Sequence, residues 1–373
     1  MKNKILTGFL LVLIGGWGSL SAQNVGSNYA RQVNTLIGTK GVGLTSGYLY
    51  PGATYPYGMV QFTPSYFSKR SGFVINQLSG GGCEHMGNFP TFPVKGKLKM
   101  SPDNILNYRI NISEEKGHAG YYEAKVQEDI HAKLTVTERT GMASYEYPAD
   151  QQYGTVIIGG GISATPIEQA AIVITAPNKC EGYAEGGNFC GLRTPYKVYF
   201  VAEFDTDALE SGTWKRNELK PNTTFAEGEY SGVYFTFDVD KKKNVQYKIG
   251  VSYVSVENAR ENLKAENTGW DFLQIQNQAE SKWNHYLGKI EVEGTNPDRT
   301  TQFYTHLYRS FIHPNVCSDV NGEYMGADFR VHKSRSKHYT SFSNWDTYRT
   351  QIQLLSILDP EVASDIVISH QLF

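Results

Sequence analysis

The chain has 373 residues, of which 35 are basic (Lys and Arg) and 37 are acidic (Asp and Glu), so its formal net charge is −2. This balance gives no electrostatic footprint for nucleic acid or for an anionic membrane, and we exclude both as partners. The chain also contains 25 Tyr, 18 Phe and 5 Trp. Such an aromatic surplus fits the core of a β-rich protein, and it also fits a sugar-binding protein, whose rings stack on pyranose faces.

The first 22 residues have the features of a secretory signal peptide. Lys2 and Lys4 precede an apolar run from Ile5 to Ile14, which is too short to span a bilayer, and small residues lead to Ala22. We therefore expect cleavage after Ala22 and a secreted or periplasmic protein. The remainder, about 350 residues, is long enough for two domains.

From Tyr29 to Ser255 the pattern is one of short strands separated by turns. Apolar and polar residues alternate on either side of Thr140-Gly141, which predicts a hairpin. Further runs are rich in β-branched and aromatic residues and are bounded by Gly, Pro or Asp: GTVIIGG, VYFVAEFD, GVYFTFDVD and YKIGVSYVS. Many short strands at this spacing predict a large antiparallel β-sandwich, which we place at residues 23–260.

The pattern changes after Val256, where Ala, Glu, Lys, Asn and Gln predominate and the alternation ends. One or two helices are expected there, in a helical linker at residues 261–297. Asn296 can then cap a further helix, Pro297 suits its first position, and Pro314 ends it.

Two last helices are expected on either side of Asp359-Pro360. Leu355 belongs to an apolar face of the first, and Ile366 to an apolar face of the second, which continues to Phe373 without a stop signal. An apolar stripe of this kind needs a packing partner. We therefore expect residues 298–373 to be the start of a larger helical domain, and the chain to be a fragment.

Four cysteines lie at positions 83, 180, 190 and 317. Disulfides are allowed in an exported protein. Cys180 and Cys190 flank the turn-rich sequence EGYAEGGNF, and we predict that these two form a disulfide. No Cys-x-x-Cys occurs, which argues against a zinc ribbon or a thioredoxin-type site.

The glycine-rich stretch QLSGGGCEHMG carries the triplet Cys83, Glu84 and His85. The triplet could bind a metal, supply a nucleophile or form the wall of a pocket. Adjacent side chains of an extended segment point to opposite faces, which disfavours a shared metal ion. A cysteine nucleophile would need a His partner and an oxyanion hole. We favour a pocket wall, in which Gly81 and Gly82 let the backbone approach a ligand closely, over a purely structural loop.

The sequence SNWDTYRT, at the entrance of a predicted helix, combines three groups that suit a sugar. Trp345 offers an apolar platform, Asp346 a pair of acceptor oxygens and Arg349 a fixed fork of donors. The alternative is that Asp346 caps the helix and pairs with Arg349. We favour sugar binding.

Several segments in collinear order resemble glycoside hydrolase family 92. They are LYPGATYPYGMVQFTPS, QLSGGGC, AGYYEAKV, LTVTERTG, SYVSVENARENL, FYTHLYRSFIHPNVCSDVNGEYMGAD and SNWDTYRT. The resemblance implies a β-sandwich followed by an (α/α)6 barrel, here truncated after its first helices. It also implies a calcium-dependent exo-α-mannosidase that acts with inversion on a mannose-containing glycan, such as an N-glycan or yeast mannan.

The resemblance further implies that the general acid and the general base lie in the later barrel, so that no catalytic residue and few calcium ligands occur in this chain. The missing C-terminal barrel would then be its partner, and the fragment alone would be inactive. Trp345 and Asp346 match the family's WDT motif and would contact the terminal mannose, with Arg349 beside them. The loop from Gly81 to His85 would face the sugar.

Two departures from the family pattern concern linkage preference. Asn76 stands where many relatives have a histidine, and Thr63-Pro64-Ser65 stands where relatives often have SPD. An alternative function is a lectin-like, carbohydrate-binding β-sandwich without catalysis, and a third possibility is a structural fragment without activity.

Overall fold

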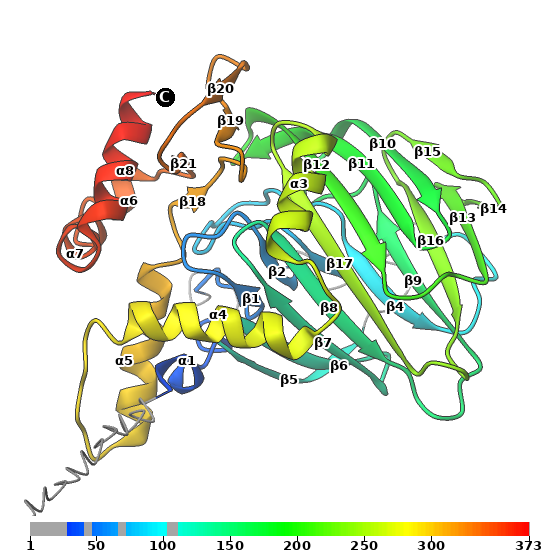
Figure 1. The fold of residues 1–373 in the computed structure, drawn as a ribbon, viewed down its shortest axis with the longest axis horizontal. Coiled ribbons are helices and arrows are strands. Elements are labelled where there is room, and N and C mark those ends of the chain that lie inside the picture. The colour runs from blue at the N-terminus through cyan, green and yellow to red at the C-terminus, as the bar shows by residue number, and fades with distance from the viewer. Residues whose placement is uncertain (1–27, 41–46, 66–71, 103–110, 373) are drawn as a thin grey trace, which may run out of the picture.

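We analysed a computed structural model of the chain, which describes residues 28–40, 47–65, 72–102 and 111–372 (Figure 1). The predicted signal peptide lies outside the described residues. The two large sheets form one body, and most of the helices lie to one side of it together with the short strands near the C-terminus, as Figure 1 shows. The prediction of a large antiparallel β-sandwich followed by a few helices is confirmed.

The sandwich consists of two antiparallel sheets in the described part of the chain. The first has the order β1 (Ala53–Thr54), β2 (Gln61–Pro64), β3 (Phe73–Val74), β4 (Thr91–Lys95), β9 (Tyr153–Gly159), β16 (Ser231–Asp238), β13 (Glu210–Lys215), β14 (Glu218–Pro221). The second has the order β15 (Phe225–Glu227), β10 (Ile167–Ala176), β11 (Lys179–Phe189), β12 (Leu192–Phe204), β17 (Asn244–Ser252), β8 (Thr140–Glu146), β7 (Ile130–Val136), β6 (Tyr121–Val126), β5 (Ile112–His118).

Aromatic and β-branched side chains fill the space between the two sheets. Phe204 of β12 lies 5.0 Å from the ring centroids of both Phe235 and Phe237 of β16, and 5.3 Å from that of Tyr247 of β17. Alternate residues of β6 are buried, as the period of two requires for a strand with one covered face. The hairpin predicted around Thr140-Gly141 is the β7–β8 pair.

Helices precede and follow the sandwich. They are α1 (Tyr29–Gln32), α3 (Val256–Glu266), α4 (Phe272–Leu287), α5 (Pro297–Ser310), α6 (Asn344–Thr347), α7 (Gln351–Leu358) and α8 (Pro360–Gln371). Two short strand pairs lie between α5 and α6: β18 (Asn315–Val316) with β21 (Tyr339–Thr340), and β19 (Glu323–Met325) with β20 (Val331–Lys333). The predicted cap of α5 is confirmed, because the Asn296 side chain accepts from the N–H groups of the first turn.

A second hydrophobic core joins the helices to the sandwich, and Tyr57 lies at its centre. The ring of Tyr57, in the connection between β1 and β2, meets Tyr286, Phe311 and Tyr339 edge-on, at centroid distances of 5.6, 6.0 and 6.1 Å. Its backbone N–H donates to Phe311, and its carbonyl accepts from Val316, both at 2.8 Å. The sandwich therefore contributes a loop to the core of the helical part.

A buried carboxylate ties α3 to the segment after β18. Asp319 accepts hydrogen bonds from Ser252 (2.6 Å), Asn258 (2.8 Å) and Asn262 (2.6 Å). Burial raises the pKa of the Asp319 carboxyl, and the three donors oppose that rise. Because both oxygens are used, Asp319 fixes where the helical part begins relative to the end of the sandwich.

A second polar link starts from the turn between β7 and β8. The Nη1 atom of Arg139 lies 2.6 Å from carboxylate oxygens of both Glu138 and Glu266, and its Nε donates to the Ser318 carbonyl at 2.7 Å. Lys337 donates to Glu138 as well. Burial would raise the pKa of Glu138, but the charges of Arg139 and Lys337 lower it.

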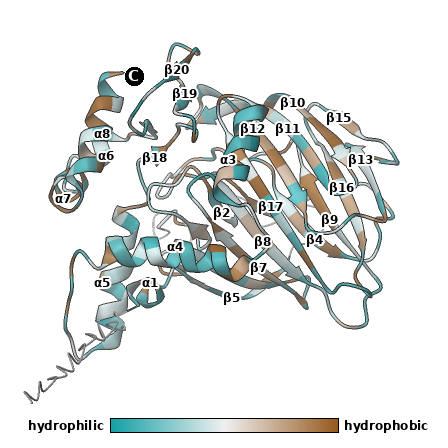
Figure 2. Cartoon of the chain, in the orientation of Figure 1, coloured by the Kyte–Doolittle hydropathy of each residue, from teal (hydrophilic) through white to brown (hydrophobic). Residues whose placement is uncertain are grey.

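The last two helices bury one face and expose another. Leu355 of α7 and Ile366 of α8, which the sequence places on apolar faces, are buried in the second core. Ile357, Val367 and Leu372 are exposed, and Figure 2 shows hydrophobic colouring along both helices.

We expect replacement of Asp319 by Ala to lower the free energy of unfolding by about 3 kcal/mol, because three buried donors lose their acceptor. Urea unfolding followed by tryptophan fluorescence measures this change. The matched control is Asp328→Ala, an exposed carboxylate that accepts from His332 at 2.9 Å. Equal losses in the free energy of unfolding for the two substitutions would show that the buried Asp319 carboxylate stabilises the fold no more than an exposed one.

Candidate functional site

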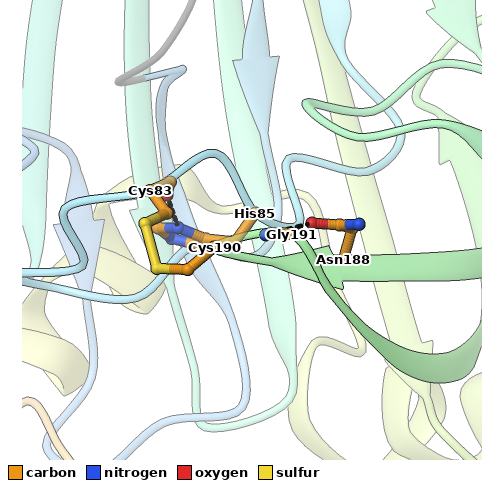
Figure 3. The surroundings of a disulfide bond; sticks show 5 residues. All are labelled: Cys83, His85, Asn188, Cys190 and Gly191. Carbon is orange, nitrogen blue, oxygen red and sulfur yellow. Dashed lines mark hydrogen bonds between the residues drawn. A yellow bond between two sulfur atoms is a disulfide. The ribbon is translucent and has the colours of Figure 1, made fainter.

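The glycine loop, defined here as residues 77–85, is covalently attached to the hairpin between β11 and β12 (Figure 3). Cys83 forms a disulfide with Cys190, with 5.3 Å between their Cα atoms, whereas Cys180 and Cys317 are free and buried. The predicted pairing of Cys180 with Cys190 is therefore wrong. Its error has a simple cause, because residues 179–189 form strand β11, and ten extended residues span ~33 Å.

Asn76 precedes the glycine loop and forms hydrogen bonds to the two residues, Gly87 and Asn88, that come shortly after it. Its side-chain oxygen accepts from the N–H groups of Gly87 (3.1 Å) and Asn88 (2.8 Å), and its Nδ2 donates to the Asn88 side chain at 3.0 Å. The residue is 1% exposed. Asn76, which departs from the family pattern, thus serves the loop's own structure.

Two imidazoles hold consecutive amides of the glycine loop. The Nε2 atom of His85 accepts from the Leu78 N–H at 2.8 Å, and the Nε2 atom of His313 accepts from the Ser79 N–H at 2.7 Å. Each Nε2 must therefore carry no proton. The Nδ1–H groups donate to the Cys83 carbonyl (2.6 Å) and to the Asn315 side chain (2.5 Å). Both histidines are fixed as the same neutral tautomer.

Burial lowers the pKa of His85, in spite of its hydrogen bonds to the loop backbone. Burial also lowers the pKa of His313 to about 4, although its hydrogen bond to Asn315 acts in the opposite direction, and the nearby His85 lowers it further. The two rings therefore stay neutral at neutral pH, which is the form that the loop requires.

His313 also connects the glycine loop to the second predicted motif. Its backbone carbonyl accepts from Nε2 of Gln351, the first residue of α7, at 3.0 Å. The same Nε2 donates to the Ser310 carbonyl at the end of α5. The sequence SNWDTYRT leads directly into Gln351, so one residue, His313, joins both motifs.

The three predicted sugar contacts lie on or beside α6 and face solvent. Trp345 is 86% exposed. Asp346 lies inside α6 and accepts from the Ser343 hydroxyl at 2.5 Å, while the Arg349 guanidinium lies 5.1 Å from the ring centroid of Tyr348. The alternative that Asp346 caps the helix is not what the structure shows, because Ser343 occupies the N-cap position.

The loop residues divide by exposure. Gly82 and Glu84 are exposed, Gly81 and Cys83 are partly exposed, and His85 is buried. Cys83 cannot be a thiolate nucleophile while it is in a disulfide, and burial raises the pKa of the free thiols of Cys180 and Cys317. The described residues contain no group of three or more His, Cys, Asp or Glu that could hold a metal ion.

The solved structures that resemble this chain include glycosidases. A family GH92 α-mannosidase from Bacteroides thetaiotaomicron is 26% identical, with a TM-score of 0.83, and the match covers 93% of this chain and 49% of that one. A structure of that enzyme with mannoimidazole matches with a TM-score of 0.82 and 26% identity, over 92% and 48% of the two chains. An inverting GH92 mannosidase of the same organism, 24% identical over 91% and 48%, shares the fold at a TM-score of 0.78.

An uncharacterized secreted glycosidase of Arthroderma benhamiae is 26% identical over 383 residues, which cover 91% of this chain and 48% of that protein. Two family descriptions also match: the glycosyl hydrolase family 92 N-terminal domain at residues 32–252, and the family 92 catalytic domain at residues 258–371. The chain belongs to glycosyl hydrolase family 92. It spans about half the length of these relatives.

Sequence reasoning did not find the role of His313 or the partner of Cys83. A signal for His313 is present, since it follows the apolar face of a predicted helix and precedes proline, but nothing in the pattern places it next to a loop more than 200 residues away.

We expect the fold to lose stability as the pH falls from about 6.5 to about 4, the interval between the ordinary pKa of histidine and that of buried His313. Above this interval neutral His313 contributes its full stabilisation. Within the interval the unfolded chain binds a proton at this histidine and the folded chain does not, so the stabilisation is lost as the pH falls. The contribution is on the order of 3 kcal/mol.

Urea unfolding at about pH 7 and about pH 5 measures about 2 kcal/mol of this loss, because the rest falls below about pH 5. His313→Gln keeps an acceptor for the Ser79 amide but does not titrate, so its stability should change less with pH. The exposed His306, replaced by Gln, is the matched control. The interpretation is wrong if both variants alter the pH dependence equally.

Proposed function

We propose that the full-length protein is an exo-acting α-mannosidase that removes terminal α-linked mannose from N-glycans or mannan with inversion. The observation that carries this proposal is the match, over 93% of this chain, to a GH92 α-mannosidase at a TM-score of 0.83. The complex of that enzyme with mannoimidazole supports a mannose-containing substrate.

In this proposal the chain supplies groups that bind the terminal sugar. Trp345 provides a face for the apolar C–H surface of the pyranose, and its large exposure leaves that face free. Asp346 and Arg349 provide acceptors and donors for hydroxyl groups. The backbone of the loop at Gly81 and Gly82 supplies a further wall of the sugar site.

Inversion requires two carboxyl groups about 6.5–9.5 Å apart, one to protonate the leaving oxygen and one to activate water. We propose that both, with the ligands of a calcium ion, belong to the part of the protein outside this chain. The described residues alone do not fit a metal site, since they provide no cluster of three ligands. The fragment by itself should therefore bind sugar without cleaving it.

We propose that the protein acts in the periplasm or outside the cell. The secreted relative supports this location, as does the Cys83–Cys190 disulfide, because disulfides persist in oxidising compartments. Within the described residues, no helix combines the length and hydrophobicity needed to cross a bilayer.

We expect the full-length gene product to release mannose from α-mannosides, and chelation of calcium to stop the release. A coupled mannose assay with and without a chelator, followed by calcium readdition, measures both. Release of a different sugar with mannosides untouched would contradict the proposed function. Mannose binding to the full-length protein without release would favour the lectin-like alternative.

We expect Asp346→Ala in the full-length protein to cost about 2–4 kcal/mol of transition-state stabilisation, measured as a loss of kcat/KM. Ser343→Ala is the matched control, because it removes the hydrogen bond to Asp346 but keeps the carboxylate. A much smaller loss for Ser343→Ala would assign the effect to the carboxylate itself. A change of kcat/KM within about twofold for Asp346→Ala would rule out a sugar contact.

A further inference from the structure

The β11–β12 hairpin extends beyond the sheet as a two-stranded ribbon, defined here as residues 187–195. Its neighbour β10 pairs with β11 only as far as Gly186, and β17 pairs with β12 only from Tyr199 onwards. Among the described residues the two strands of the ribbon pair only with each other, as at Phe189 and Leu192, and Arg193 forms a bidentate ion pair with Glu168 of β10. An isolated two-stranded hairpin is marginally stable in water, so this ribbon needs support at its tip.

The tip is a two-residue turn formed by Cys190 and Gly191. Both have positive φ, 53° and 82°, as a type I′ turn requires, and the Asn188 side chain accepts from the Gly191 N–H at 3.0 Å. Asn, Asp or Gly is the usual first residue of such a turn, because other residues are strained there. A cysteine at this position is explained by its bond to Cys83 rather than by the turn.

Two contacts between described residues attach the tip to the glycine loop. One is the disulfide between Cys83 and Cys190, which joins positions 107 residues apart (Figure 3). The other is the edge-on contact of Phe189 with the His85 ring, at a centroid distance of 5.9 Å. His85 in turn holds the Leu78 amide. The ribbon and the loop therefore form one continuous structure.

We propose that Cys83, Cys190 and Phe189 are positioning residues that make the ribbon the outer support of the sugar-binding loop. This inference rests on the proposed function, in which Gly81 and Gly82 face the sugar. The disulfide holds the loop in its binding conformation before the substrate arrives. Without it, substrate binding must order both the loop and the ribbon, and that ordering cost weakens binding.

The test uses the full-length protein with Cys83→Ser, with Cys190→Ser and with both. We expect hydrogen exchange to become faster in peptides covering residues 77–85 and 187–195. We expect KM for 4-nitrophenyl α-mannopyranoside to rise about tenfold with little change in kcat, because the loop binds but does not react. The double variant should behave like each single one.

Loss of a long-range disulfide also lowers global stability, so the control must separate the two effects. Cys180→Ala supplies it: Cys180 is a buried core thiol, and its replacement destabilises the fold but leaves the disulfide intact. We expect a lower melting temperature with unchanged exchange in the loop and unchanged KM. Phe189→Ala should speed exchange in the loop while the disulfide remains.

A second measurement needs no substitution. Dithiothreitol converts the disulfide to two thiols and is itself oxidised to its cyclic disulfide, and the treated wild type should show the same exchange and KM as the serine variants. Unchanged hydrogen exchange in both peptides would contradict the proposal that the disulfide supports the glycine loop. Faster exchange with unchanged KM would overturn the role in substrate binding. If the wild type cleaves no mannoside, the proposed function fails, while the exchange data still decide whether the disulfide supports the loop.

Discussion

The imidazole of His313 lies where three parts of the molecule meet. Its ring accepts the Ser79 amide proton from the glycine loop, and its carbonyl accepts from Gln351 at the start of α7. Asn315, which receives the Nδ1–H, donates to carbonyls of Gly58 and Ile312. The sandwich, the end of α5 and the segment carrying Trp345 are thus joined at one residue. A proton on Nε2 would break the hydrogen bond from the Ser79 amide, whereas Gln351 bonds to the backbone carbonyl of His313.

Two further links between the sandwich and the helices, through Asp319 and Arg139, are also polar and buried. Asp319 uses both carboxylate oxygens on donors from β17 and α3, and Arg139 bridges Glu138 and Glu266. Buried ionic groups add less stability than their geometry suggests, because desolvation opposes their attraction, but they tolerate only one arrangement. Segments that resemble the family, such as SYVSVENARENL and CSDVNGEY, therefore supply polar contacts that dock the helices on the sandwich.

The fold was predictable because its signals are local. Alternation identified β7 and β8, and Asn296-Pro297 marked the start of α5. The disulfide was not predictable in this way. The Gly-rich sequence EGYAEGGNF suggests turns, yet pairing with β10 and β12 keeps this segment extended as strand β11. That strand carries Cys180 into the core and Cys190 to the far tip of the hairpin. The conformation of this segment is set by its pairing with neighbouring strands, and the periodicity of the sequence does not show which strands will pair.

The candidate site was predicted as a set of residues but not as an assembly. Trp345 and Asp346 were chosen for their chemistry, and the loop for its glycines, whereas their connection through His313 exists only in three dimensions. Two neutral histidines and a disulfide fix the glycine loop in one conformation. The described residues include no cluster that could hold a metal ion. Preorganised binding groups lower the cost of holding a sugar whether or not the groups that cleave it are present. In the function we propose, sugar affinity and sugar cleavage are therefore assigned to different parts of the protein.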